Sequence, residues 1–250
     1  MAVLYVVATP IGNLGDITVR ALDTLRAVDV IACEDTRRTR TLLGHHGIST
    51  RTVAYGHDET RSGRVLGLLR SGLQVALVSD AGTPGISDPG GGAVRAAREA
   101  GFAVVPIPGA SAVTALLSVA GTSAQGVRFH GFCSPKPGRR RAQLERLLAD
   151  GAPFVLFEGP HRVLKLLGAL AEAAPERSIV LGRELTKLHE EVLAGTATAL
   201  CDELASRARI AGELTLLVTG NRPRRGAAAP ERGARTARPV TQGEAGMKLE

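Results

Sequence analysis

The stretch Ser79-Asp80-Ala81-Gly82-Thr83-Pro84-Gly85-Ile86-Ser87-Asp88-Pro89-Gly90 decides how the rest of the chain is interpreted. It follows the apolar run at residues 75–78, which is typical of a buried strand. Its three glycines permit positive φ angles and a close approach of the backbone to a ligand. Ordinary turn chemistry is the simpler explanation. A loop of this length that also carries the carboxylates of Asp80 and Asp88 favours a ligand-binding role.

The same transition from strand to loop recurs along the first half of the chain. We expect strands at residues 3–8, 30–33, 75–78 and 102–107, with helical segments between them, as in a parallel, doubly wound α/β sheet. Ligands bind at the carboxyl edge of such sheets, where the loops that follow the strands converge. Five loops of small or charged residues follow predicted strands, at 9–16, 34–38, 79–90, 108–111 and 158–162.

A polar linker of small residues at 121–126 predicts a domain boundary. We expect an N-terminal α/β domain over residues 1–121 and a C-terminal mixed α/β domain over residues 122–220. Strands at 191–194 and 213–219 are expected to pair around a helix at 197–207. Residues 221–250 are rich in Arg, Gly, Ala and Pro, without apolar periodicity, and we expect a disordered basic tail there.

Composition limits the function classes. The chain has 250 residues, with 44% hydrophobic and 22% charged residues, as expected of a globular protein with a substantial core. Its formal net charge of +7 is compatible with a nucleic acid or another polyanion as partner. Three widely spaced cysteines show no metal-binding spacing and suggest a reducing, cytoplasmic location. We expect no signal peptide and no membrane span.

Several familiar catalytic signatures are absent from the sequence, among them the GxxxxGK[ST] phosphate loop, HExxH and GxSxG. The glycine pattern at residues 80–85 follows the third predicted strand instead of the first, and prolines interrupt it. These features argue against an ordinary dinucleotide-binding Rossmann site.

Six motifs, in this order along the chain, resemble those of the ribosomal RNA small subunit methyltransferase I family, which belongs to the tetrapyrrole methylase superfamily. They are Val7 to Asp16, Cys33-Glu34-Asp35-Thr36-Arg37, Ser79 to Gly90, Pro108-Gly109-Ala110-Ser111-Ala112, Glu158-Gly159-Pro160-His161-Arg162 and Arg183-Glu184-Leu185-Thr186-Lys187. The chain departs from the family at Gly159, where a serine is usual, at Cys133-Ser134-Pro135, where Leu-Pro is usual, and at Ala211-Gly212-Glu213, where Lys-Gly-Glu is common.

The resemblance implies an S-adenosylmethionine-dependent 2′-O-methylation of a cytidine in the decoding region of 16S rRNA. It also implies a class III methyltransferase fold with two α/β domains, the cofactor in the cleft between them, and a homodimer. It places contacts to the methyl donor at Pro10, Asp80, Thr83, Ser111 and Ala112. Gly82 joins this set because the backbone around it would have to approach the donor closely. Ser111 can also act as a helix N-cap.

The acceptor of such a reaction is a ribose hydroxyl, which needs help to lose its proton. Glu34, Asp35, Lys187 and Glu191 are candidates for this role. Lys187 acts as a base only if burial or neighbouring cations lower its pKa. Otherwise its role is to hold a phosphate as a cation, and the sequence leaves both possibilities open.

Basic residues are the candidates for binding the RNA backbone. We expect Arg37, His161 and Arg162 to contact phosphates. A basic loop contributes Lys136, Arg139, Arg140 and Arg141, although charge runs are often just solvated surface. Aromatic residues make up 3% of the chain, so recognition is expected to depend on phosphates and shape more than on base stacking.

Two other functions compete with this reading. A methylase that acts on a carboxylate-rich tetrapyrrole would also use arginines to bind its substrate. A non-enzymatic nucleic-acid-binding protein would account for the charge, but it would not need the loops rich in Gly, Pro and Asp.

Overall fold

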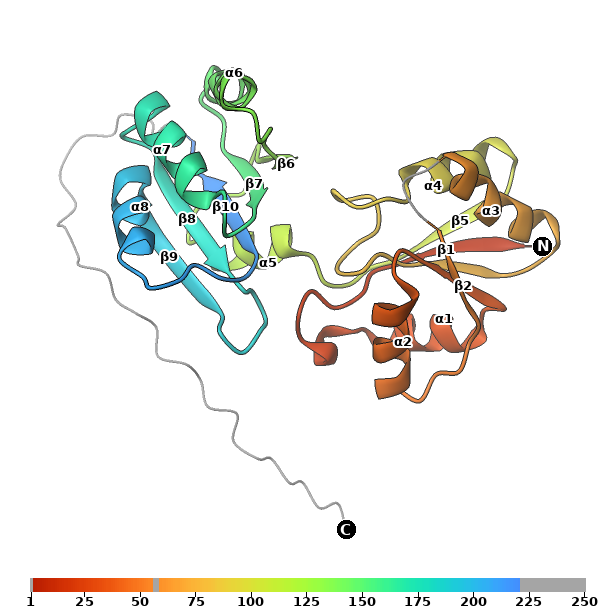
Figure 1. The fold of residues 1–250 in the computed structure, drawn as a ribbon. Coiled ribbons are helices and arrows are strands. Elements are labelled where there is room, and N and C mark those ends of the chain that lie inside the picture. The colour runs from red at the N-terminus through yellow and green to blue at the C-terminus, as the bar shows by residue number, and fades with distance from the viewer. Residues whose placement is uncertain (1, 56–58, 221–250) are drawn as a thin grey trace, which may run out of the picture.

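The computed structural model describes residues 2–55 and 59–220, and in it the chain forms two lobes, each built on a five-stranded sheet (Figure 1). The predicted α/β class is therefore confirmed. The predicted basic tail at 221–250 lies outside the described residues. None of the described helices is long and apolar enough to cross a membrane.

The first lobe contains a parallel sheet, as predicted, in the order β3-β2-β4-β1-β5. Helices α1 and α2 cover one face of this sheet, and α3 and α4 cover the other (Figure 1). Its elements are β1 (Val3–Val7), a 3-10 turn (Leu14–Asp16), α1 (Val19–Ala27), β2 (Val30–Cys33), α2 (Thr36–His45), β3 (Thr52–Ala54), α3 (Glu59–Arg70), β4 (Val75–Leu77), α4 (Gly91–Glu99) and β5 (Ala103–Ile107).

The second lobe contains a mixed sheet in the order β6-β7-β10-β8-β9. Only β6 and β7 are parallel, and the other neighbours are antiparallel. The predicted pairing of the last two strands is wrong, because β8 lies between β9 and β10 and bonds to both. The elements are β6 (Arg128–Phe132), α6 (Pro137–Leu148), β7 (Phe154–Glu158), α7 (Val163–Ala173), β8 (Ser178–Arg183), β9 (Glu191–Thr196), α8 (Ala197–Ala205) and β10 (Leu214–Val218).

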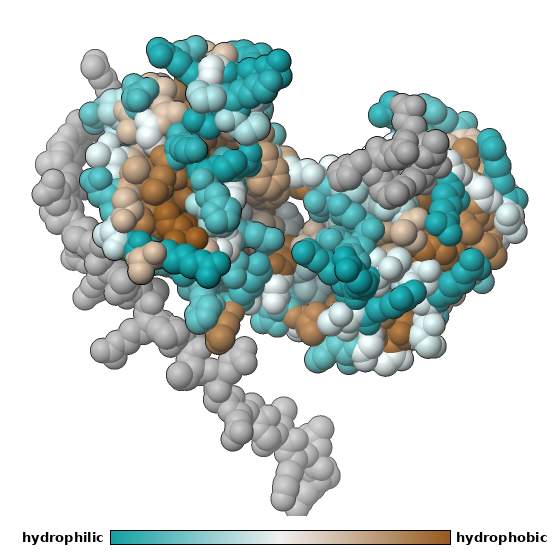
Figure 2. Space-filling model, in the orientation of Figure 1, coloured by the Kyte–Doolittle hydropathy of each residue, from teal (hydrophilic) through white to brown (hydrophobic). Residues whose placement is uncertain are grey.

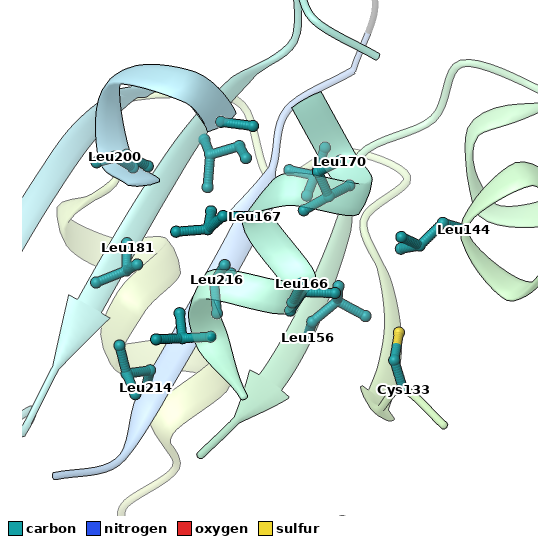
Figure 3. Close-up of a cluster of buried hydrophobic side chains, with 14 of the residues drawn as sticks. Cys133, Leu144, Leu156, Leu166, Leu167, Leu170, Leu181, Leu200, Leu214 and Leu216 are labelled. Atoms are coloured by element: carbon teal, nitrogen blue, oxygen red, sulfur yellow. The ribbon is translucent and has the colours of Figure 1, made fainter. Parts of the chain in front are cut away.

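Helix α7 anchors the core of the second lobe. Its buried residues, Val163, Leu166, Leu167 and Leu170, recur at the spacing of one helical face. They pack against buried leucines of the sheet strands, as Figure 3 shows for Leu156, Leu181 and Leu216 among others. Each fully buried leucine contributes about 1.5–3 kcal/mol through removal of its apolar surface from water, so this layer holds the strand ends at fixed positions.

Helix α5 (Ala112–Val119) links the two lobes. Its apolar surface packs on the other face of the second sheet, where Leu116 meets Val155, Val180 and Leu217. The helix thus belongs to the second sheet, although it precedes the boundary predicted at residue 121. The chain crosses between the lobes just before α5, at the loop that follows β5. Separate folding of the two predicted domains stays a prediction.

Candidate active site

A cavity of about 310 Å³ lies where loops of both lobes meet. The space-filling view shows a notch between the lobes on the face drawn (Figure 2). The first lobe contributes loops that follow β1, β4 and β5, as predicted from the carboxyl ends of parallel strands. The lining residues are Ile11, Ala81, Gly82, Thr83, Ile86, Ser87, Asp88, Ser111, Ala112, Phe132, Phe157, Glu158, Gly159, Leu185, Lys187, Glu213, Leu214 and Thr215.

The loops after β1 and β4 are fixed to each other by Thr9 and Gly82. The amide of Thr9 donates to the carbonyl of Gly82 at 2.9 Å, and the amide of Gly82 donates back at 3.0 Å. The Thr9 hydroxyl also donates to the carbonyl of Ser79 at 3.2 Å. Gly82 has a φ of +76°, and an added Cβ would lie 3.3 Å from Ile11. This position therefore requires glycine for both conformation and space.

The residues predicted to contact the donor divide into two groups. Gly82, Thr83, Ser111 and Ala112 line the cavity. Ser111 occupies the N-cap position of α5, but its side chain makes no capping hydrogen bond, which leaves the hydroxyl available to a ligand. Pro10 is buried beside Thr9 and is absent from the cavity lining.

Asp80 also lies outside the cavity lining. Its carboxylate accepts a hydrogen bond from the amide of Asp35 at 3.0 Å and lies 3.5 Å from the guanidinium of Arg38. Asp80 thus ties the loop after β4 to the start of α2.

Lys187 is the one predicted catalytic residue that lines the cavity. Its Nζ lies 2.9 Å from Glu184 and 3.1 Å from Glu213. Burial alone would lower the pKa of Lys187, but the hydrogen bonds to these two carboxylates outweigh burial and raise the pKa above its usual value. The condition for a lysine base, a pKa lowered by burial or cations, is therefore not met. Lys187 is a cation in this arrangement.

The segment that carries Lys187 has an unusual backbone. Glu184 and Thr186 have φ values of +51° and +67°, which non-glycine residues rarely adopt. Glu184 stabilises this conformation, since it accepts from Lys187 and from the amide of Glu213 at 2.9 Å. Backbone strain of this kind clusters at functional sites.

The other candidate bases are held elsewhere. Asp35 caps α2 and pairs with Arg37, whose hydrogen bonds lower the pKa of Asp35 to about 2. Glu34 precedes it outside the cavity lining. Glu191 is bound by Arg207 and Arg183, and the hydrogen bonds from Arg207 above all lower its pKa to about 2. Carboxyl groups with such low pKa values are weak proton acceptors.

Asp88 is a carboxylate of the cavity that the sequence-based site assignment omitted. Burial raises the pKa of Asp88, the hydrogen bond with Ser79 opposes the shift, and the nearby charges of Glu34 and Asp80 add to it. Asp88 lies in the loop at residues 79–90, and this position was the sequence signal that could have identified it as a site residue. Glu158 and Glu213 were missed as well, and they bring the carboxylates in the cavity wall to three.

The basic run lies on a helix instead of the predicted loop, because α6 begins at Pro137. Lys136 and Arg139 are exposed, and Arg141 pairs with Glu145 at 2.9 Å. Arg140 is only 8% exposed, and its Nε has no hydrogen-bond partner among the described residues. The four side chains therefore do not form one exposed patch, as the loop assignment had implied.

Arg162 lies at the edge of the cavity. Its guanidinium pairs with the buried carboxylate of Glu158 at 2.5 Å, and Glu158 also accepts from the amide of Gly159 at 2.8 Å. His161 is exposed next to it, just before α7. Arg37 is also exposed, but it is paired with Asp35 at 2.8 Å.

The fold and the cavity define a methylase of a known class. The family of Tetrapyrrole (Corrin/Porphyrin) Methylases matches residues 3–201. The crystal structure of the methyltransferase CobJ is similar with a TM-score of 0.68 at 18% identity, covering 91% of this chain and 98% of that one. The cobalamin biosynthetic enzyme cobalt precorrin-4 methyltransferase is similar with a TM-score of 0.62 at 20% identity, covering 86% and 94%. These likenesses show the fold.

Closer relatives narrow the class. The ribosomal RNA small subunit methyltransferase I of Leptospira biflexa is 50% identical over 192 residues, which cover 76% of this chain and 80% of the relative. The protein of the same name from Mesorhizobium japonicum is 48% identical over 218 residues, which cover 86% and 74%. The chain belongs to the ribosomal RNA small subunit methyltransferase I family and is an S-adenosylmethionine-dependent methyltransferase.

The cavity fits this methyl donor by size and charge. Its volume lies within the range of small-molecule sites. S-Adenosylmethionine carries a sulfonium and an ammonium, and the wall carries the carboxylate of Asp88, whereas Glu158 and Glu213 are paired with Arg162 and Lys187. The uncapped Ser111 hydroxyl and the backbone around Gly82 provide further polar contacts. Ile11 and Leu185 supply apolar surface.

Proposed function

We propose that this protein methylates the 2′-hydroxyl of a cytidine in the decoding region of 16S rRNA, and that its substrate is this rRNA within the assembled small ribosomal subunit. The observation that carries the proposal is Lys187, paired with Glu184 and Glu213 in the wall of a donor-sized cavity. The chain is also 50% identical over 192 residues to a protein named for small-subunit rRNA methylation. A 2′-oxygen that loses its proton develops negative charge, and a fixed ammonium stabilises such charge.

In this proposal the donor contacts come from the first lobe. The backbone around Gly82, with Thr83, Ser111 and Ala112, holds the donor, while Asp80 ties the loop after β4 to the start of α2 and Pro10 is buried next to Thr9. S-Adenosylmethionine, when bound, supplies an electrophilic methyl group on a sulfonium. The residues of the chain orient the acceptor and exclude water.

Lys187 positions the ribose oxygen from the second lobe, and its partners Glu184 and Glu213 fix the ammonium. The proton of the hydroxyl passes to a carboxylate of the cavity. Asp88 suits this role best, because its raised pKa makes it a stronger acceptor than Asp35 or Glu191. Of the other predicted catalytic residues, Asp35 caps α2 and donates its amide to Asp80, and Glu34 directly precedes it in the chain.

Phosphate contacts in the proposal come from basic side chains of several segments. Arg162 and His161 contribute from the segment before α7, Arg37 contributes from α2, and Lys136 and Arg139 contribute from the N-cap and the first turn of α6. Arg141 reaches phosphate only by leaving Glu145, and the buried Arg140 supports the helix.

The decisive experiment measures transfer of a labelled methyl group from S-adenosylmethionine to small subunits isolated without this modification. Mapping of ribose methylation should locate the label on one cytidine of the decoding region. Label on a base, on a ribosomal protein or only on an added tetrapyrrole would overturn the proposal. Label only on the tetrapyrrole would favour the tetrapyrrole methylase alternative. The absence of transfer to RNA, ribosomal protein and tetrapyrrole alike would favour a non-enzymatic binding protein. The homodimer and the cytoplasmic location stay predictions from the family.

A further inference from the structure

Three of the five phenylalanines of the chain form one cluster beside the cavity. The ring centroids of Phe129 and Phe157 are 5.0 Å apart, and those of Phe132 and Phe157 are 5.7 Å apart, both in edge-to-face arrangements. Phe132 and Phe157 line the cavity. Phe132 is 51% exposed and Phe129 is 37% exposed. A cluster that served only the core would not leave this much aromatic surface in water.

A bulge in β6 assembles this cluster. Residues 129 and 132 are separated by an odd number of positions, so a regular strand would point them to opposite faces of the sheet. The pairing of β6 with β7 shifts between Phe129 and Gly131, and Phe132 then lies opposite Phe157. Gly131 has a φ of +78°, and a Cβ there would lie 2.6 Å from the Ser87 hydroxyl. Bulges of this kind redirect side chains next to active sites.

A cation stands over the exposed ring. The Cζ of Arg162 lies 5.7 Å from the centroid of Phe132, within the range of a cation–π contact. The pair with the buried Glu158, whose side chain is 2% exposed, fixes the guanidinium in this place. An aromatic face with an arginine beside it offers stacking to a base and a charge to the adjoining phosphate.

The aromatic cluster and the predicted contacts to the methyl donor lie on different walls of the cavity, so they are suited to different ligands. The predicted donor contacts, Gly82, Thr83, Ser111 and Ala112, come from loops of the first lobe and the start of α5, whereas Phe132 and Phe157 come from the second sheet. The guanidinium of Arg162 would repel the sulfonium of the donor and attract a phosphate. The second wall of the cavity is thus suited to an RNA base.

We infer that Phe132, supported by Phe129 and Phe157, is the platform on which the base of the target nucleotide stacks, with Arg162 binding a neighbouring phosphate. This inference rests on the proposed function and specifies its substrate contact: a pyrimidine nucleotide taken out of its own stack, with its ribose directed toward Lys187. Recognition then combines base stacking with phosphate binding, a combination that the low aromatic content did not indicate.

The test uses the full-length protein and two fluorescent RNA probes, a short oligocytidylate and a strand of equal length with abasic riboses. Phe132→Leu should weaken binding of the oligocytidylate about fivefold or more and leave binding of the abasic strand unchanged. Phe132→Trp should retain binding of both strands. Arg162→Gln should weaken both, since both carry phosphates. Val19→Ala, which alters an exposed residue of α1, is the matched surface control.

Other outcomes would overturn the inference. Equal loss for both strands, or no loss for either, would exclude stacking on Phe132. A weaker affinity of Phe132→Leu for S-adenosylmethionine in calorimetry would assign the ring to the donor. A change in sedimentation from dimer to monomer would assign it to self-association. Ultraviolet cross-linking of wild-type protein to an oligocytidylate with 5-iodocytidine is independent of any variant, and the cross-link should map to Phe132.

Failure of the inference and failure of the proposed function give different results. If wild-type protein methylates the cytidine of the small subunit while Phe132→Leu binds oligocytidylate normally, the platform is wrong and the proposed reaction stands. If wild-type protein transfers no methyl group to the subunit, the proposed reaction fails, whatever the binding data show.

Discussion

The side chain of Lys187 lies directly against the backbone of Gly12, so that a β-carbon at Gly12 would overlap with the lysine Cγ. Gly12 belongs to the loop after β1 in the first lobe, and Lys187 to the connection between β8 and β9 in the second. The absence of a side chain at Gly12 therefore leaves room at the junction of the lobes for the lysine side chain, whose Nζ pairs with Glu213.

Gly12→Ala should displace Lys187 without removing its charge. The φ of Gly12 is not positive, so the alanine backbone is not strained. We expect methyl transfer to fall roughly 10–100-fold, because small displacements of positioning groups have effects of this size, while the unfolding temperature changes little. Gly44→Ala in α2 is the control, since a Cβ there meets nothing within 4 Å. Full activity of Gly12→Ala would show that the position of Lys187 is unimportant.

Replacement of Lys187 tests whether it acts as a cation or as a base. Lys187→Gln should lower the rate about 100-fold or more, and Lys187→Arg should keep a measurable part of it, because the charge near the developing oxyanion is retained. Affinity for S-adenosylmethionine should change little in either variant. A wild-type rate that climbs with pH up to the titration of a lysine, together with an inactive arginine variant, would instead identify Lys187 as the base.

Gly82 and Gly85 form a matched pair in the loop after β4. Both have positive φ, +76° and +85°, but only Gly82 has close neighbours. Gly85→Ala should destabilise the fold by about 1 kcal/mol through backbone strain alone. Gly82→Ala should cost more and should also weaken S-adenosylmethionine binding in calorimetry, because the added methyl group presses on Ile11 at the cavity. Equal donor affinity in both variants would place the donor away from this loop.

The sequence predicted most of the fold because its strands are short apolar runs separated by helical patterns. The exceptions have physical causes. β3 is three residues long and has no distinguishing pattern. The start of α6 lies within the predicted basic loop; it contains Pro137 and Gly138, which are common in loops, yet proline is also favoured in the first turn of a helix. The place of β8 between β9 and β10 depends on packing that local patterns do not encode.

The site was predictable where its residues lie in loops after parallel strands, as with Gly82, Thr83 and Ser111. The partners of Lys187 were not predictable, because Glu213 lies far along the chain, just before β10, and pairs with Lys187 only in the folded protein. Together Glu184 and Glu213 raise the pKa of Lys187, a direction that the sequence left open. The aromatic cluster was missed because an alternating strand pattern would separate Phe129 from Phe132, and only the bulge brings them together.

Asp88→Asn tests the proposed proton acceptor through activity and stability together. The pKa of Asp88 is raised above its ordinary value of 3.8, chiefly by burial. A group with a raised pKa in the folded state stabilises the fold below its unfolded pKa, and this contribution is lost as the pH rises through the folded pKa. At neutral pH the wild-type protein therefore carries an unfavourable charge that asparagine removes. We expect Asp88→Asn to unfold about 1–3 °C higher at neutral pH, a modest shift because the group is only half buried. The gap should close at acidic pH.

The same variant should lose most of its methyl-transfer activity at neutral pH, and the acid limb of the wild-type pH–rate profile should disappear with it, because the carboxylate that accepts the proton is gone. Asp23→Asn, an exposed partner of Arg26 on α1, is the matched control and should change neither property. Higher stability with lower activity would mark Asp88 as a residue kept for function at the expense of stability. An unchanged acid limb in Asp88→Asn would assign the proton to another carboxylate, and Glu213→Gln and Glu158→Gln would then be compared in the same assay.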